Sequence, residues 1–596
     1  MRIKKGVSSV QVGISIVVIL LIVGGGAYYF VTLPPNVITT TQTVTSTTAR
    51  TVTSTSATTA TVTVAPTTTT AAAPTLVVQD NSPYSNADPR GTTHIAAAQQ
   101  NYETLTYLSP NATVLPGLAT SWKPIGDGST WEYTLRQGVT FHDGTTLNAT
   151  DVVFSILNTV KWNQGDATDV WNIFKSATAV SQYVVDLTFT QPTNGPIITS
   201  SAYSAFIFSH NVLKFAGGVN DTKGLAAWFN SYHDDGSGPY VLNSTASSLS
   251  GGVWTMNQYK SYWRGWKVGQ VTNIIFKLVT NVNTAIQLAK QGQFDVIGVG
   301  GQFQFVPQLL AAGLNIVQGP THGSIWLLFN TQHQYLNNSL VRQALLTAVN
   351  YQQIVQQAYY NYGINYNGAI NPGLPFYDST APGFTVSGNL TAAKALLAQA
   401  GYPNGLPNVQ WTLTHSTGSP FEATIGALLN TYWQPLGVTV TIQGLSFTNQ
   451  VIKAGYVNGS TPFSPGPISY ASTSKAQDLA LLNWNGATSD PYLVPYQLFA
   501  IQNSPYQNSI IQNWSYLRNQ TFTDLLAKFR QDQIVNPAAA AQDVKTLNQL
   551  FFQLAPGWAM FQGQQIWVVS PHWHGVVMNP NYSFDFYFYY DWTYSP

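Results

Sequence analysis

A long uncharged segment near the amino terminus has the composition of a membrane-spanning helix, unlike the rest of the chain. Val7 to Leu33 contains no charged residue, whereas Arg2, Lys4 and Lys5 precede it. At about 1.5 Å per residue, a helix of this length can cross a hydrocarbon core of about 30 Å. Because basic flanks stay on the inner side, the rest of the chain is expected outside the cell. We therefore predict a membrane anchor helix over residues 1–33.

The junction "KKGVSS" before this helix is similar to archaeal class III signals, which are cut before the apolar segment and keep it. The acidic residue common early in pilin helices is missing. Cleavage of this kind and an uncleaved signal anchor therefore both stay open. An ordinary signal peptide fits less well, because it has a shorter apolar core and a small-residue cleavage site.

A stalk is predicted over residues 34–74. From Thr39 to Ala73 the sequence is almost entirely Thr, Ser, Ala and Val, with the single charge Arg50. Such a segment cannot bury enough apolar surface to fold, and its composition is typical of O-glycosylated stalks. Sequons for N-glycosylation follow the stalk, and the candidate acceptors are Asn111, Asn243 and Asn458.

Charge is scarce throughout the chain. Charged residues make up 8% of the sequence and aromatic residues 13%, and the net charge is +1. No basic run interleaves with aromatic residues, so we expect no nucleic-acid partner. The absence of cysteine excludes disulfides and thiolate sites. Since thermophilic proteins at neutral pH are enriched in charged pairs, we predict an acidic, archaeal exterior and a stability that changes little between mildly acidic and neutral pH.

The remainder, from Thr75 onward, is too long for one core and mixes helical and strand patterns. "NTAIQLAKQGQFDVIGVG" predicts a helix with Gly292 as its left-handed cap, followed by a short buried strand. "NLTAAKALLAQAGYPNG" predicts a helix that Gly401 ends, and "PNVQWTLTHS" a strand. A further helix is predicted between Leu340 and Tyr360. These patterns favour an α/β fold.

The stretch "WEYTLRQGVTFHDGTTLNATDVVFSIL" concentrates polar residues and could be an active site. Residues 131–135 and 139–141 alternate like the two strands of a hairpin. Asn148 is placed to cap a helix, with Asp151 three residues later near its positive end. We therefore interpret His142, Asp143 and Asp151 as turn and cap residues rather than catalytic groups.

The same region carries a family resemblance. "PGLATSWKPIGDGSTWEYTLRQGVTFHDGTTLNATDVVFSIL" is similar to the signature of the family 5 extracellular solute-binding proteins, the oligopeptide, dipeptide, nickel or oligosaccharide-binding subunits of ABC importers. Further landmarks follow in family order: "GSGPYVL", "AIQLAKQGQFDVI", "LLFNTQHQYLNNSLVRQALLTAVN", "AAKALLAQAGYPNG" and "LLNWNGATSDPY". The resemblance covers essentially all residues from Thr75 to the carboxyl terminus.

The resemblance implies a periplasmic-binding-protein fold of type II with three lobes. Lobe I is expected from residues 75–116, 236–329 and 561–596, lobe II from 117–235 and lobe III from 330–560. The solute would lie between lobes I and III and would stabilise their closed arrangement. The implied partners are a small solute, the permease subunits and the ATPase subunits of the importer. We expect a cell-surface monomer that is not an enzyme and needs no cofactor and no metal.

The resemblance also bears on the solute. In peptide-binding members, the Asp that pairs with the peptide α-amino group aligns with Ala487 here. A buried ammonium without a counter-charge is costly, although Asp490 could substitute after a loop shift. A neutral oligosaccharide needs aromatic faces and amide or hydroxyl groups, which this chain supplies. We therefore favour an oligosaccharide of the cellobiose or maltose type, with peptides as the alternative.

The predicted ligand-binding residues lie near the expected cleft. Trp484 is proposed as a stacking platform, with Asp490 and Tyr492 in the same loop. The other candidates follow from their places in the family pattern, and they are Trp326, His415, Ser416 and Tyr84.

Other readings explain less of the sequence. His572 and His574 could face a metal from one strand, but no third ligand lies nearby in the sequence. No carboxylate pair is identifiable as that of a glycosidase, which disfavours a secreted hydrolase. A structural cell-surface protein would account for the anchor and the stalk but not for the later landmarks.

Overall fold

The structure is a computed structural model. It describes residues 74–80, 87–91, 95–164, 167–217, 222–231, 233–248, 250–299, 302–417, 419–457, 464–465, 476–486, 488–501, 513–581 and 588–596. The predicted anchor and stalk lie outside the described residues, as do Tyr84, Asn458 and Ala487. Among the helices of these ranges, none combines the length and the apolar character that a bilayer crossing requires.

A mixed sheet of eleven strands organises the part of the chain that is described. Its hydrogen-bonded order is β15 (Val438–Leu445), β14 (Val409–Ser416), β18 (Leu479–Trp484), β12 (Asn315–Phe329), β19 (Gly557–Val569), β11 (Val296–Gly298), β1 (Thr75–Asp80), β10 (Asn273–Leu278), β9 (Val253–Gln258) and β8 (Tyr240–Leu242), with β13 (Gly363–Ile364) beside β19. Central strands such as β12 and β18 are rich in Leu and Ile, as expected for strands buried on both faces.

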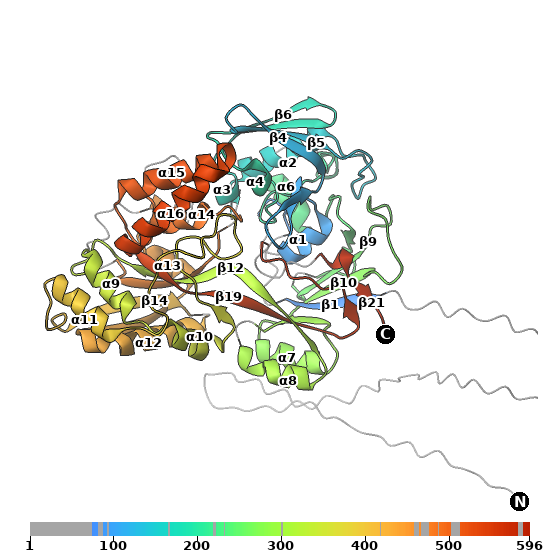
Figure 1. Cartoon of the computed structure of the whole chain (residues 1–596). Coiled ribbons are helices and arrows are strands. Elements are labelled where there is room, and N and C mark those ends of the chain that lie inside the picture. Colours follow the sequence, from blue (N-terminus) through green and yellow to red (C-terminus); the bar gives the residue numbers. More distant parts are fainter. Residues whose placement is uncertain are drawn as a thin grey trace, which may run out of the picture. The chain divides into compact units, whose positions relative to one another are not determined.

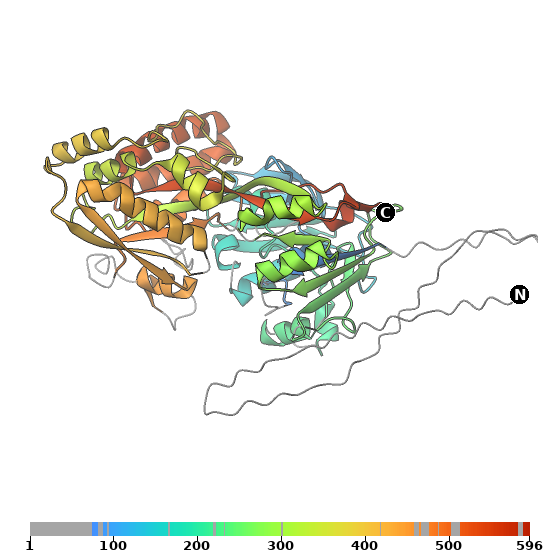
Figure 2. The same cartoon turned by 90° about the horizontal axis from the view of Figure 1, so that it is seen from below.

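The two longest strands, β12 and β19, belong to both halves of this sheet. They pair with each other antiparallel, and the ladder shifts register between Pro320 and Ser324. Pro320 has no N–H to donate, and Gly319 and Gly323 lack side chains that would pack, so this stretch is suited to an irregularity. In the view of Figure 2, the yellow and orange elements lie at one side, the green and blue ones at the other, and these strands run between them.

Helices cover each half of the sheet and enclose separate cores (Figure 1). The largest core contains buried apolar residues between Ile325 and Phe561. Its helices are α9 (Ser339–Thr347), α10 (Tyr351–Tyr359), α11 (Leu390–Gln399), α12 (Pro420–Trp433), α13 (Phe447–Lys453), α14 (Leu493–Phe499), α15 (Gln520–Val535) and α16 (Pro537–Leu554). The other half packs α7 (Val282–Lys290) and α8 (Val306–Ala311) against β11 and β19.

A second sheet has its own core. Its order is β4 (Ala119–Ile125), β5 (Thr130–Leu135), β7 (Val184–Phe189) and β6 (Phe174–Ser181), and α2 (Ala149–Trp162) packs on it. The remaining elements are α1 (Ile95–Asn101), β2 (Thr106–Leu108), β3 (Val114–Pro116), α3 (Ala167–Val170), α4 (Gly195–Ile198), α5 (Val212–Phe215), α6 (Thr222–Asn230), β16 (Tyr456–Val457), β17 (Ser464–Pro465), β20 (Trp573–His574) and β21 (Thr593–Tyr594).

Several sequence predictions of local structure are confirmed. The helix and strand around Gly292 correspond to α7 and β11, and Gly292 has φ +71°. The helix that Gly401 ends is α11, and the strand after it is β14. Asn148 caps α2, and its own backbone N–H donates to Asp151 in a capping box.

Two predictions of local structure are wrong. Residues 131–135 do not form a hairpin with residues 139–141, because both edges of β5 are already paired, one with β4 and the other with β7. The helix predicted between Leu340 and Tyr360 is two helices, α9 and α10. The chain breaks between them because Asn350 takes an extended conformation and its side chain caps α10 by accepting from the Gln353 N–H.

Candidate functional site

The polar residues of the "FHDG" stretch are used in local structure. His142 forms an ion pair with Asp234 and hydrogen-bonds the Gly238 carbonyl at 3.0 Å. Asp143 accepts from the Thr145 N–H at 2.8 Å within the turn, and Asp151 pairs with His210 at 2.6 Å. These contacts agree with the interpretation of His142, Asp143 and Asp151 as structural residues.

The carboxyl ends of two parallel strands bring three of the predicted ligand residues to one edge. β14 and β18 pair parallel, with Leu413 opposite Leu479. Both strands therefore end on the same side, β14 at His415 and Ser416 and β18 at Trp484. In open α/β sheets, ligands bind outside this edge of the strands. We call it the carboxyl edge.

Trp484, the predicted stacking platform, ends β18 at this edge and packs in part against the largest core. Its indole is half-buried, and its Nε1 donates to Gln497 Oε1 at 2.8 Å, which fixes the orientation of the ring. Its backbone lies opposite Ser324, the residue that resumes the β12 ladder after the register shift. Trp484 therefore stands where the two halves of the main sheet meet.

Asp490 and Tyr492 follow Trp484 in the chain but turn toward the second sheet. Asp490 Oδ1 accepts from the Tyr492 N–H at 3.0 Å and from Gln533 Nε2 at 3.3 Å. The Tyr492 ring stacks on Tyr496, and the Arg530 guanidinium lies 4.7 Å from its centroid. Both predicted residues are more than nine-tenths buried, and they line a small cavity of about 30 Å³ together with Ile173 and Ile198 of the second sheet's core.

Arg530 extends this contact to the elements around the second sheet. Its Nη2 donates to Thr193 Oγ1 at 3.1 Å, and Ile534, one turn later on α15, packs against the core of the second sheet. Hence α15 holds the Trp484 loop and touches the second sheet with the same few residues. The sequence pattern did not indicate Arg530, because its partners are 38 or more residues away in the chain.

A buried carboxyl group holds Ser416 at the end of β14. The Ser416 N–H donates to Glu422 Oε2 at 2.8 Å, and His415 Nδ1 contacts the Ser416 carbonyl at 2.9 Å. Burial raises the pKa of Glu422 to about 7, although the bond from Ser416 lowers it. Glu422 can therefore carry a proton at mildly acidic pH while it fixes the end of β14.

Trp326 lies in the interior. Its side chain is 0% exposed and packs edge-on against Tyr366, Phe499 and Phe551. Because β12 is a central strand covered by helices, a tryptophan there fills the core and is not offered to a solute in this structure. Tyr84, the remaining candidate, lies outside the described residues.

His322, within the register shift of β12, was not predicted. Its ring is 3% exposed, and burial lowers its pKa to about 4. Nε2 lies 3.0 Å from Asn581 Oδ1, and Asn581 Nδ2 donates to the Ser109 carbonyl at 2.6 Å. The signal that could have found it is "GPTHGS", a Gly- and Pro-rich interruption within an apolar strand.

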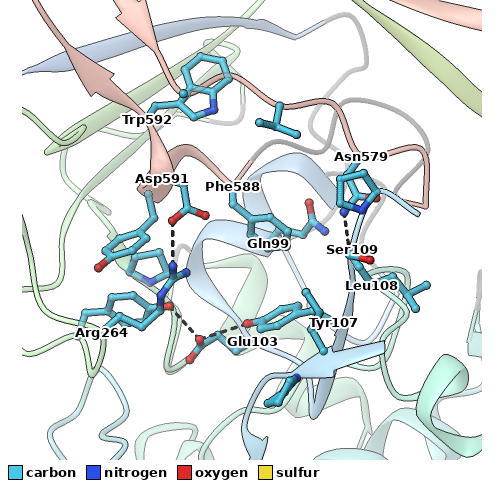
Figure 3. Close-up of a pocket in the computed structure, with 18 of the residues that line it drawn as sticks. Gln99, Glu103, Tyr107, Leu108, Ser109, Arg264, Asn579, Phe588, Asp591 and Trp592 are labelled. Atoms are coloured by element: carbon cyan, nitrogen blue, oxygen red, sulfur yellow. Dashed lines mark hydrogen bonds and ion pairs between the residues drawn. The ribbon is translucent and has the colours of Figure 1, made fainter. Parts of the chain in front are cut away.

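A cavity of about 460 Å³ lies on the β1 side of the main sheet (Figure 3). Glu103 is at its base and accepts from Tyr262 and Trp263 at 3.0 Å and from Tyr107 at 3.2 Å. Among the described residues, its lining comes from 99–116, 239, 262–264, 575–579 and 588–592. The cavity therefore does not include the predicted ligand residues at the carboxyl edge.

Comparison with known proteins identifies a family and relatives to which this chain is similar. The family model described as bacterial extracellular solute-binding proteins, family 5 Middle, matches residues 113–506. The glutathione-binding protein GsiB of Salmonella typhi is 26% identical over 357 residues, which are 57% of this chain and 64%, less than two thirds, of that protein. GsiB of Escherichia coli O157:H7 is 23% identical over 531 residues, covering 86% of this chain and 93% of the relative.

A solved structure supports the fold. The periplasmic binding protein DppA of Helicobacter pylori, in complex with the peptide STSA, superposes with a TM-score of 0.67 at 20% identity. The match covers 87% of this chain and 98% of DppA. The predicted periplasmic-binding-protein fold of type II is thereby confirmed, and the chain belongs to the family 5 solute-binding proteins of ABC importers.

Proposed function

We propose that this solute-binding protein captures a neutral oligosaccharide of the cellobiose or maltose type and delivers it to the permease of its importer. We propose lobe I from residues 75–116, 236–329 and 561–596, lobe II from 117–235 and lobe III from 330–560. Closure would bend β12 and β19 at the register shift and bring lobe I over the carboxyl edge. The chain acts as a monomer and performs no catalysis.

The proposal of a neutral ligand rests on which carboxylates near Trp484 could pair with a ligand ammonium. Position 487 holds Ala, so it supplies no carboxylate. Asp490 is 7% exposed, and its Oδ1 already accepts hydrogen bonds from Tyr492 and Gln533, so the carboxylate is oriented by the protein and not by a ligand ammonium. A half-buried indole suits the apolar face of a sugar ring. His415 and Ser416 would supply polar contacts at the neighbouring strand end.

A peptide is the second candidate, favoured by the relatives. GsiB proteins are named for glutathione, and DppA was solved with a peptide. A peptide would require its amino group to find another partner than residue 487. The two classes therefore differ in whether a carboxylate at this position helps or harms binding.

A thermal-shift screen of the chain from Thr75 onward tests the proposal. At one hundred times the dissociation constant, a bound oligosaccharide should add about 2.7 kcal/mol to the unfolding free energy. Trp484→Ala should remove most of this gain, because stacking contributes about 1 kcal/mol or more. Trp122→Ala, at a half-buried tryptophan on β4, is the matched control and should keep the gain.

Ala487→Asp separates the two ligand classes. It should weaken sugar binding by placing an unpaired carboxylate in the site, and strengthen binding only if the solute is a peptide. Stabilisation of the wild-type chain by peptides and not by sugars would overturn the sugar assignment while leaving solute capture intact.

We also propose that residues 1–33 anchor the protein to the membrane and that 34–74 form a glycosylated stalk on an archaeal surface in acid. Asn111 is exposed, as an acceptor must be, whereas Asn243 Nδ2 donates to Asn257 Oδ1 at 2.7 Å. The full chain should fractionate with membranes. Mass spectrometry of the native amino terminus then separates a cut before Val7 from an uncleaved anchor.

A further inference from the structure

We propose that the cavity of Figure 3 is a second binding site, separate from the carboxyl edge, for a single neutral sugar ring. The cavity is about 460 Å³, within the range of roughly 300–1,000 Å³ that is typical of small-molecule sites. It lies between α1, the β2–β3 hairpin, the segment around Trp263 and the carboxyl-terminal segment. No residue from 330–560 lines it, so it does not depend on lobe closure.

The charged side chains that line the cavity already have hydrogen-bond or ion-pair partners within the protein. Glu103 receives hydrogen bonds from Ser237, Tyr262 and Trp263, the first at 2.8 Å. Arg264 pairs with Asp591 at 2.9 Å, and Figure 3 shows this pair facing the cavity. Because Glu103 is buried among these neutral donors and Arg264 is paired with Asp591, neither offers an exposed unpaired charge, and a neutral ligand requires none.

Aromatic rings supply flat apolar surface. Tyr107 and Phe588 meet edge to face with their centroids 5.4 Å apart, and both are half-buried. Trp263 is also half-buried, and its ring is held by the Arg136 guanidinium at 4.1 Å. Such faces accept the C–H surface of a sugar ring, while Tyr107 and the ion pair of Arg264 and Asp591 lie where ring hydroxyls can reach polar groups. A purely aromatic ligand would leave those polar groups against apolar edges.

Gln99 is the observation that points to a ligand with donors. Its side chain is 5% exposed, yet Oε1 has no hydrogen-bond partner among the described residues. It stands on α1 and lines the cavity beside Phe588 and Asn579 (Figure 3). Buried amide oxygens are nearly always paired, so a hydroxyl of a ligand at this position would satisfy it. Sequence reasoning did not single out Gln99.

Methyl glucoside is the probe, and saturation-transfer NMR with titration is the measurement, because a half-open site for one ring should bind at about millimolar affinity. The Trp484→Ala background removes the aromatic platform of the carboxyl edge, so the result does not depend on the proposed function. Binding should persist in this background. Adding Gln99→Met should weaken it about fivefold to tenfold, the loss expected for one buried hydrogen bond or slightly more.

Two further variants make the test decisive. Gln410→Met, at an exposed position of β14, is the matched control and should leave binding unchanged. Val577→Trp adds bulk at an exposed wall position and should abolish binding even if Gln99→Met folds poorly. The proposal is overturned if methyl glucoside does not bind the Trp484→Ala protein, if Gln99→Met and Val577→Trp leave the affinity unchanged, or if indole binds there and the glucoside does not.

Discussion

Replacement of Glu422 by Gln should change how stability depends on pH. Glu422 lies in the first turn of α12, is 1% exposed, and accepts from the Ser416 N–H at 2.8 Å. Burial raises its pKa from 4.5 to about 7. The native state therefore binds this proton at a higher pH than the unfolded chain does. The associated stability is complete in acid and is lost as the pH rises through about 7.

The magnitude follows from the two pKa values of Glu422. Between about pH 8 and about pH 5, a group that titrates at 4.5 when unfolded and at about 7 when folded adds about 2.5 kcal/mol to the unfolding free energy. Gln resembles the protonated acid and can still accept from Ser416. The Glu422→Gln protein should therefore equal the wild type near pH 5 and exceed it near pH 8.

Urea unfolding across this pH range, followed by tryptophan fluorescence, measures the difference. Asp378→Asn is the control. Burial raises the pKa of Asp378, but hydrogen bonds from Thr380 outweigh burial and bring it below 3.8, so its titration lies below about pH 5 in both states. Its curve should stay parallel to that of the wild type. Parallel curves for Glu422→Gln would refute the argument that burial of this carboxyl controls the slope.

Three further results are expected. Asn148→Ala should lower the unfolding free energy by about 1 kcal/mol in urea, because it removes the cap of α2. Arg530→Met should weaken solute binding several-fold in calorimetry by freeing α15 from Thr193 and Tyr492, and equal affinity would contradict this role. His322→Gln should flatten the acid side of the stability profile. The folded pKa of His322 is lowered to about 4 by burial, so the wild type loses stability as the pH falls from about 6.5 toward 4.

Local features could be predicted because their causes are local. The cap at Asn148 and the helix end at Gly401 depend on residues within one turn, and both are found in the structure. The pairing of β5 depends on β7, whose paired residues lie 50 or more positions away, so alternation alone suggested the wrong partner. The break at Asn350 was missed because the apolar pattern continues in phase on both sides.

The candidate site was predictable only in part. The family resemblance placed Trp484, His415 and Ser416 near the expected cleft, and they share an edge because strands β14 and β18 are parallel. The burial of Trp326 depends on Phe499 and Phe551, which lie far away in the sequence. The cavity beside Gln99 combines residues of α1 with residues of the last segment of the chain, and no local pattern reveals such a meeting.

The position of β19 has a consequence for biosynthesis. This strand lies between β11 and β12, so each half of the main sheet is incomplete until residues 557–569 are present. β1, at the other end of the domain, must likewise wait for β10, about 200 residues later. A chain leaving the cell from its amino terminus therefore cannot finish folding before its last segment emerges. Export in an extended state therefore delays no folding step that the chain could have completed earlier. Fragments that end before Gly557 should be cleaved by surface proteases.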